Sequence, residues 1–110
     1  MAPFAVVSHG IGVDPVFNYG NQRALDMFEM SWEAFTVLPS RLSAETVNQA
    51  ERIKLLNSVT KHGYIHNYSG IRISKSGRRF MIRDATIWNL ISPEGQFYGQ
   101  AALIQDWEYL

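Results

Sequence analysis

Alternating apolar and polar positions predict two short strands at the start of the chain. Residues 4–10 (FAVVSHG) form an apolar run closed by glycine, and residues 16–19 (VFNY) form a second run. Residues 11–15 (IGVDP) between them have the composition of a turn, and Pro15 has no amide hydrogen to donate to a strand ladder. The pattern therefore predicts two strands joined by a tight connection.

Helical signals follow the second strand directly. Asn21 can cap a helix over residues 22–29, because its side-chain oxygen can accept a hydrogen bond from a free amide of the first turn. Ser31 can cap a second short helix over residues 32–36 in the same way. Proline at the start of 39–43 (PSRLS) interrupts the helical pattern, so this segment is predicted to be a loop or a single turn.

The longest predicted helix covers residues 44–62. Ser43 is expected to cap its first turn, and Gly63 is expected to end it. Its predicted buried face consists of apolar residues three positions apart, namely Val47, Ala50, Ile53, Leu56 and Val59.

Strand patterns replace helical ones after residue 63. Residues 64–74, 79–91 and 96–107 are predicted strands, and the turns 75–78 and 92–95 join them into two consecutive hairpins. Two strands, then helices, then three strands predict an α+β fold: a five-stranded antiparallel sheet with the helices packed on one face.

Composition narrows the class of protein further. The chain has 110 residues, of which 46% are hydrophobic and 18% charged, so one domain spanning residues 1–110 is expected. The absence of cysteine excludes disulfides, thiolate metal ligands and a cysteine nucleophile. No apolar run is long enough to cross a bilayer, and the first ten residues lack the basic leader of a signal peptide. We therefore expect a cytoplasmic protein that does not contact a membrane.

Charged residues are segregated along the chain although the net charge is zero. Residues 1–51 carry two basic and six acidic side chains, 52–83 carry eight basic and none acidic, and 84–110 carry four acidic and none basic. The basic segment could meet an acidic partner, a phosphorylated ligand or nucleic acid. Alternatively, the acidic segments neutralise it in the folded protein and leave a solvated face. A chain of zero net charge is a poor binder of nucleic acid, so no nucleic-acid partner is expected.

The order of these elements resembles that of a PAS domain. Residues 17–35 (FNYGNQRALDMFEMSWEAF) resemble the passage from the second PAS strand through an Asn cap into two short helices, and 75–80, 92–95 and Asp106 fit the same template. More closely, the sequence is similar to the MEKHLA family, a PAS-like domain found at the C-terminus of class III homeodomain-leucine zipper plant transcription factors and as short bacterial proteins. The resemblance covers nearly the whole chain. Glu29 departs from the template, because PAS domains usually have glycine there.

The resemblance implies a sheet whose helix-covered face can hold a small molecule and whose outer face often pairs with another protomer. PAS domains bind haem, flavins, organic acids or no ligand, so the fold leaves the cofactor unknown. Compared with light-oxygen-voltage PAS domains, Ser40 occupies the position of the photoactive cysteine, and Arg41 matches an arginine that can contact the flavin phosphate. At the three positions where those domains have amide side chains that bind the flavin ring, this sequence has Arg72, Ile82 and Ile104. A cysteinyl-flavin adduct is therefore excluded, and flavin binding of that type is disfavoured.

A ligand pocket is expected between the sheet and the helices. Arg41 and Arg72 are the predicted anchors for an acidic group. The alternative is that the pocket side chains pack against one another and fill the core, as a small domain requires. The predicted pocket consists of Phe28, Trp32, Arg41, Leu56, Arg72, Ile82, Ala102 and Ile104.

Histidine and serine residues offer few other sites. His62 and His66 have a metal-binding spacing for one helix face, but Gly63 is expected to separate them, so no metal site is predicted. His62 also lies at the wrong end of the long helix for a haem ligand, which disfavours haem. Ser8 and His9 point to opposite faces of a strand and have no oxyanion loop, so no catalytic residues are predicted.

The sequence thus predicts a non-enzymatic, PAS-like sensory domain. A ligand between sheet and helices would shift the helices and alter a partner-binding surface, giving a homodimer or a complex through the sheet face. Two alternatives remain open at this point: a pure protein-interaction module with a filled core, and a small α+β enzyme.

Overall fold

A five-stranded antiparallel sheet organises the protein in the computed structural model, which describes residues 3–110. The strands are β1 (Ala5–His9), β2 (Phe17–Gly20), β3 (Tyr64–Ile73), β4 (Arg79–Ile91) and β5 (Phe97–Tyr109), in the spatial order β2-β1-β5-β4-β3. The helices are α1 (Gln22–Phe28), α2 (Trp32–Phe35), the 3₁₀ helix η1 (Ser40–Ser43) and α3 (Thr46–His62). This arrangement confirms the predicted α+β fold.

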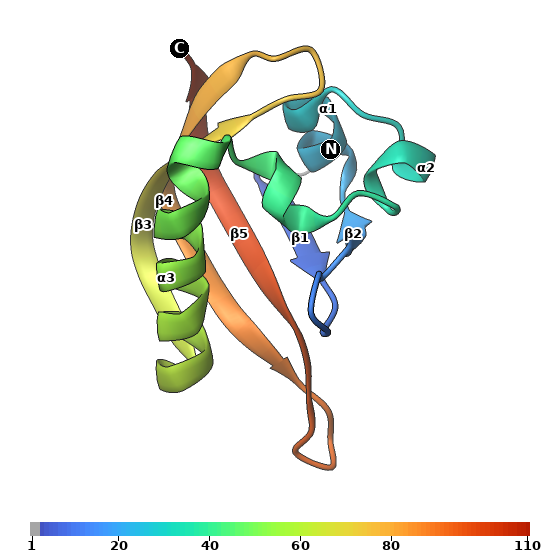
Figure 1. Cartoon of the computed structure of the whole chain (residues 1–110), viewed down its shortest axis with the longest axis vertical. Coiled ribbons are helices and arrows are strands. Elements are labelled where there is room, and N and C mark those ends of the chain that lie inside the picture. The colour runs from blue at the N-terminus through green and yellow to red at the C-terminus, as the bar shows by residue number, and fades with distance from the viewer. Residues whose placement is uncertain (1–2) are drawn as a thin grey trace.

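The chain builds the two edges of the sheet before its centre. After β1 and β2, it crosses through the helices to β3 at the far edge and returns through β4 to β5, the central strand. Figure 1 shows α3 in front of β3 and β4, with β5 beside it, whereas α1 and α2 lie on the side of β1 and β2. The ligand pocket expected from the sequence would have to lie between α3 and the central strands.

Local capping chemistry sets the short helices as predicted. Oδ1 of Asn21 accepts hydrogen bonds from the amides of Ala24 (3.0 Å) and Val6 (3.1 Å), so it caps α1 and ties it to β1. Oγ of Ser31 accepts from the amide of Ala34 at 3.1 Å and caps α2. Both predicted caps are confirmed.

The start of α3 differs from the prediction. The helix begins at Thr46, and Glu45 occupies its cap position, but its side chain makes no capping hydrogen bond to the first turn. Ser43 is not the cap, because it belongs to η1 and its hydroxyl donates to the carbonyl of Ser40 at 2.7 Å. The predicted end is confirmed: Gly63 has φ 96°, a conformation that glycine adopts without a Cβ clash.

The buried face of α3 also differs from the prediction. Val47 is 82% exposed and Ile53 is 55% exposed, whereas Arg52, Leu55 and Val59 are buried. Because an α-helix has about 3.6 residues per turn, positions three apart drift steadily around its axis and cannot all share one face. The predicted stripe was therefore wrong for Val47, Ala50 and Ile53, whereas Val59 is buried as predicted and Leu56 packs against the core. A charged residue, Arg52, also occupies the inner face.

Aromatic side chains from several elements form the core near β2. Phe17 on β2 stacks on Phe35 of α2 with ring centroids 4.2 Å apart and an interplanar angle of 17°. Phe28 on α1 meets Phe80 on β4 edge to face at 5.3 Å. These contacts fix α1 and α2 on the sheet and leave the space beneath α3 to other side chains.

Glu29 ends α1 at a position where the backbone conformation favours glycine. Its φ is 59°, in the left-handed region, and its carboxylate accepts hydrogen bonds from the hydroxyls of Ser74 and Ser76 in the β3–β4 turn. These hydroxyls hold the pKa of Glu29 below its usual value. The side chain thus offsets the backbone cost by joining α1 to the turn.

Acidic residues from both flanking segments pair with part of the basic segment. The carboxylates come from residues 1–51 and 84–110, and the arginines come from the basic segment 52–83. The pairs are Arg78 with Glu29, Arg79 with Glu45, and Arg83 with Asp106 and Glu108. They lie on the surface and contribute little to stability. Arg52 and Arg72 belong to none of these pairs.

Candidate functional site

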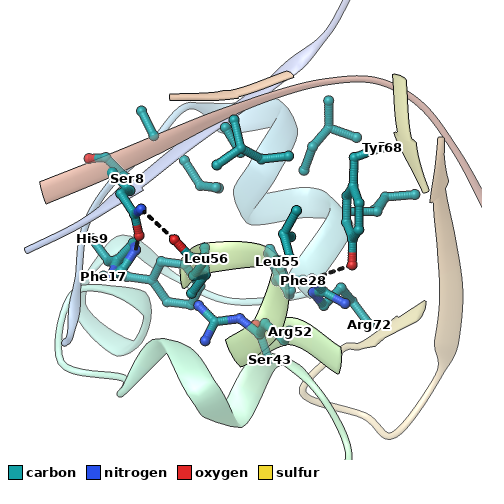
Figure 2. A pocket seen from close by; sticks show the side chains of 17 residues that line it. Ser8, His9, Phe17, Phe28, Ser43, Arg52, Leu55, Leu56, Tyr68 and Arg72 are labelled. Carbon is teal, nitrogen blue, oxygen red and sulfur yellow. Dashed lines mark hydrogen bonds between the residues drawn. The ribbon is translucent and has the colours of Figure 1, made fainter. Parts of the chain in front are cut away.

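A cavity of about 70 Å³, lined mostly by buried residues, lies between the sheet and α3. Its walls come from all five strands and from α1, η1 and α3. Figure 2 shows the guanidinium groups of Arg52 and Arg72 on one side of this pocket, with the hydroxyl of Tyr68 directed at Arg72. The pocket therefore combines apolar walls with charged groups that are remote from one another in sequence.

A second cavity of about 350 Å³ adjoins the first. It lies between α3 and the connection 10–15, whose residues 11–14 are exposed. Four residues line both cavities, namely His9, Arg52, Leu56 and Gln100. Three of these four are polar, so the boundary between the cavities is polar.

The structure brings most of the predicted pocket residues together. Six of them line the first cavity, namely Phe28, Leu56, Arg72, Ile82, Ala102 and Ile104. Arg41 lines only the second cavity, and its Nε lies 3.0 Å from Oδ1 of Asp14 in an exposed ion pair. Trp32 lies outside both cavities, is 43% exposed and packs edge-on against Tyr19.

Eleven of the residues that line the first cavity were not predicted. They include His9, Arg52, Tyr68 and Gln100. Strand alternation could have found His9, because it follows Ala5 and Val7 on the inward face of β1. Arg52 could not be found in this way, because its neighbours in sequence suggest a solvated basic face. Ser40 stands where light-oxygen-voltage PAS domains have their photoactive cysteine. It is buried and lines the second cavity.

Arg52 and Arg72 are buried without a carboxylate partner. They are 8% and 7% exposed, and no carboxylate among residues 3–110 lies within 4 Å of either guanidinium. Burial and the positive charge of Arg72 lower the pKa of Arg52 to about 10. Arginine side chains are cationic in proteins, and the lowered pKa of Arg52 still lies well above 7, so the pocket is electropositive.

Within residues 3–110, the hydrogen-bond acceptors that Arg72 reaches are neutral. Its Nη1 donates to the carbonyl of Ile71 at 2.8 Å, and its Nη2 donates to the hydroxyl of Tyr68 at 3.2 Å. The Tyr68 hydroxyl in turn donates to the carboxylate of the exposed Glu51 at 2.9 Å. Burial raises the pKa of Tyr68, which keeps its proton for that bond. Glu51 therefore contacts Arg72 only through the tyrosine.

The side-chain amide of Gln100 is oriented by three acceptors. Its Nε2 lies 3.2 Å from the carbonyl of Leu56, 3.1 Å from Oγ1 of Thr60 and 3.2 Å from Oδ1 of Asn89. Because a carbonyl oxygen can only accept, the amide nitrogen must face Leu56 and the amide oxygen must face His9. Gln100 thus connects β5 to β4 and α3.

This orientation sets the protonation of His9. Its Nε2 lies 3.2 Å from Oε1 of Gln100 and must donate, so Nε2 carries the proton. Burial, together with the charge of Arg52, lowers the pKa of His9 to about 4. The ring is therefore neutral at pH 7, and Nδ1 is a buried acceptor without a partner among the described residues.

The other sites considered from the sequence are dispersed. His62 ends α3 and His66 lies on β3, both exposed, and no three His, Asp or Glu side chains within residues 3–110 are placed to hold a metal ion. Ser8 bonds Asn18, whereas His9 bonds Gln100, so they do not form a nucleophile–base pair. In the described part of the chain, no helix has both the length and the apolar character needed to span a membrane.

Solved structures with the same fold define the class. The PAS domain of a protein from Colwellia psychrerythraea superposes with a TM-score of 0.78 at 14% identity, covering 96% of this chain and 86% of that one. The light-state dimer of the fungal blue-light photoreceptor Vivid gives 0.73 at 13% identity, covering 96% and 79%. At these identities the likeness shows the fold alone. The fold is that of PAS domains.

The chain belongs to the MEKHLA domain family, whose model matches residues 1–109. It is 27% identical over 99 residues to homeobox-leucine zipper protein ATHB-14 from Arabidopsis thaliana, covering 87% of this chain and 11% of that protein. It is 26% identical over 100 residues to homeobox-leucine zipper protein HOX9 from Oryza sativa subsp. indica, with the same coverage. The chain thus spans about a tenth of the length of these curated relatives.

Proposed function

We propose that this chain is a non-enzymatic sensory domain of the cytoplasm that binds a small ligand between its sheet and α3. One observation carries the proposal: the interior beneath α3 contains two adjoining cavities, and their shared wall holds Nδ1 of His9, which has no hydrogen-bond partner in the described chain, and Arg52, which has no carboxylate partner there. Burying such groups costs stability unless something satisfies them. A bound ligand would recover that cost.

Signal transmission would follow from the position of the pocket. One wall belongs to α3, through Arg52, Leu55 and Leu56, and the opposite wall belongs to β4 and β5. A ligand that contacts both walls would favour one position of α3 over another, provided that it binds the two positions with different affinity. The displacement of α3 would then change the surface that a partner of the domain contacts.

The outer face of the sheet is the proposed output surface. Val6, Leu103 and Thr86 form one row across β1, β5 and β4, and all three are half-buried in the isolated chain. The apolar side chains of Val6 and Leu103 in this row favour contact with a second copy or a partner protein. The same row also supports the second candidate function, a protein-interaction module that takes no ligand.

Native mass spectrometry with visible absorption spectroscopy tests the proposal. The gently purified protein is compared with the same sample after denaturation. We expect a retained small molecule, and we expect Ala102→Leu to abolish retention, because Ala102 lines the inner cavity and a larger side chain fills it. Val6→Leu on the outer face is the matched control and should retain the molecule.

Two outcomes separate the candidates. A chain of bare mass, whose thermal stability no small molecule in a metabolite library changes, would contradict the sensor and favour the interaction module. In that case Leu103→Lys, on the outer face, should abolish the association of the domain with itself or its partner while leaving the fold intact. Loss of the retained molecule in Ala102→Leu, with retention in Val6→Leu, supports the sensor.

A further inference from the structure

We propose that the ligand of this pocket is a small organic acid with a separate hydroxyl group. Its carboxylate would bind between Arg52 and Arg72, and its hydroxyl would donate to Nδ1 of His9. This inference rests on the proposed function, because it specifies the chemistry of a ligand at the same site.

The two arginines define the anion. Arg52 comes from α3 and Arg72 from β3, and each is more than nine-tenths buried on the same cavity. A guanidinium has five N–H donors; Arg72 uses two of its side-chain nitrogens on neutral oxygens, and Arg52 makes no side-chain hydrogen bond within residues 3–110. Two like charges in an interior require a counter-charge, and the planar fork of arginine fits a carboxylate.

The nearest protein carboxylate does not supply that counter-charge. Glu51 is exposed and bonds the Tyr68 hydroxyl, which stands between it and Arg72. Asp14, on the second cavity, pairs with Arg41 at 3.0 Å. The acid must therefore come from outside the described chain.

His9 defines the second group of the ligand. Its Nε2–H is directed to Gln100, so its Nδ1 accepts, is buried and has no partner in the part of the chain that the structure describes. A carboxylate has no hydrogen to donate to this nitrogen. Since His9 and Arg52 line both cavities, one molecule can meet both with a carboxylate and a hydroxyl.

Apolar walls define the ligand as organic. Leu55, Leu56, Ile82, Ile87 and Ile104 line the inner cavity with the arginines. An inorganic anion would leave these walls uncovered, whereas a short carbon skeleton would contact them. The inner volume of about 70 Å³ limits the skeleton to a few carbon atoms, and the second cavity, bordered by the exposed residues 11–14, offers a route inward.

Calorimetric titration of the whole chain with paired acids tests the inference. Each pair differs by one hydroxyl: malate against succinate, lactate against propionate, and glycolate against acetate. We expect at least one hydroxy acid to bind more tightly than its partner. Arg52→Gln and Arg72→Gln should each weaken that binding by about ten- to a hundredfold, the usual worth of a hydrogen bond to a charged group.

Matched variants separate this site from general charge effects. Arg83→Gln removes an arginine from the surface pairs with Asp106 and Glu108, and it should leave binding unchanged. His9→Phe should abolish the preference for the hydroxy acid and spare the deoxy acid. The comparison of paired acids on the unsubstituted chain gives the same information if His9→Phe does not fold.

Several outcomes would overturn the inference. One is that no hydroxy acid binds better than its deoxy partner, and another is that binding survives both arginine substitutions. If inorganic phosphate binds as tightly as the organic acids, and its binding depends on the same arginines, the pocket is an inorganic anion site instead. A neutral molecule retained in native mass spectrometry, with no acid bound, would overturn this inference and leave the proposed function standing; an empty pocket would overturn both.

Discussion

His9 on β1 and Gln100 on β5 lie opposite each other in the sheet, and Nε2 of His9 donates to Oε1 of Gln100 over 3.2 Å. The same glutamine donates to the carbonyl of Leu56 on α3 and to Oδ1 of Asn89 on β4. One side chain therefore holds two strands and the helix at the boundary of the two cavities. The network is neutral, and its neutrality depends on His9.

We expect the protein to lose stability as the pH falls from about 6.5 to about 4, the range set by the pKa of His9. The folded pKa lies below the unfolded one, so the unfolded chain binds the proton more readily. The contribution of neutral His9 to the free energy of unfolding is fully present above pH 6.5. It is lost as the pH falls towards the folded pKa and does not change further below that pKa. The total loss is about 3 kcal/mol. Urea unfolding between pH 7.5 and 4 measures it.

Two histidine variants identify the source of this pH dependence. His9→Gln should flatten the curve over that range, because glutamine does not titrate. His66→Gln, at an exposed position on β3, should leave it as in the unsubstituted chain. A curve that stays equally steep in His9→Gln would show that other groups cause the loss.

Arg52→Met should raise the free energy of unfolding of the ligand-free protein. The substitution keeps an apolar stem and removes a buried positive charge that repels Arg72. We expect a gain of about 1 kcal/mol or more. Chemical denaturation measures it, and Arg83→Met, at an exposed site, should stay within about 0.5 kcal/mol of the unsubstituted chain. A loss of stability in Arg52→Met would mean that its charge is compensated within the protein.

Gly99→Ala should disrupt the central strand pair next to His9. A Cβ at position 99 would collide with the backbone carbonyl oxygen of His9, which cannot rotate away. We expect a loss of about 3 kcal/mol or more. Gly10→Ala is the control, because its Cβ would lie 3.8 Å from the nearest side-chain atom, an ordinary contact. Thermal unfolding compares the two, and equal stability would contradict the close approach of β1 and β5.

Asn21→Ala should destabilise the N-terminal part of the fold. The side chain caps α1, accepts from the amide of Val6 and donates to the carbonyl of Phe4 at 3.0 Å. We expect a loss of about 1–2 kcal/mol, as for other caps. Asn21→Asp keeps the acceptor and loses only the bond to Phe4, so it should lose less. Equal losses in urea unfolding would assign the effect to Phe4 and not to the cap.

Local chemistry made much of the fold predictable. The caps at Asn21 and Ser31, the stop at Gly63 and the two C-terminal hairpins depend on residues close together in sequence, and each was predicted close to its observed position. Ser43 failed as a cap because its hydroxyl bonds a carbonyl three residues earlier, in a 3₁₀ turn that the sequence signal does not distinguish from a helix start.

The sequence by itself determined the order of the strands and helices, the α+β class and the family, because these follow from spacing, capping and turn residues. Only the tertiary structure placed Arg52 of α3 beside Arg72 of β3, with His9 and Gln100 on the same cavities. That placement depends on β5 inserting between β1 and β4, and on which side of α3 faces the sheet. Both are long-range packing choices, and the run of basic residues that contains Arg52 gives no local signal of them.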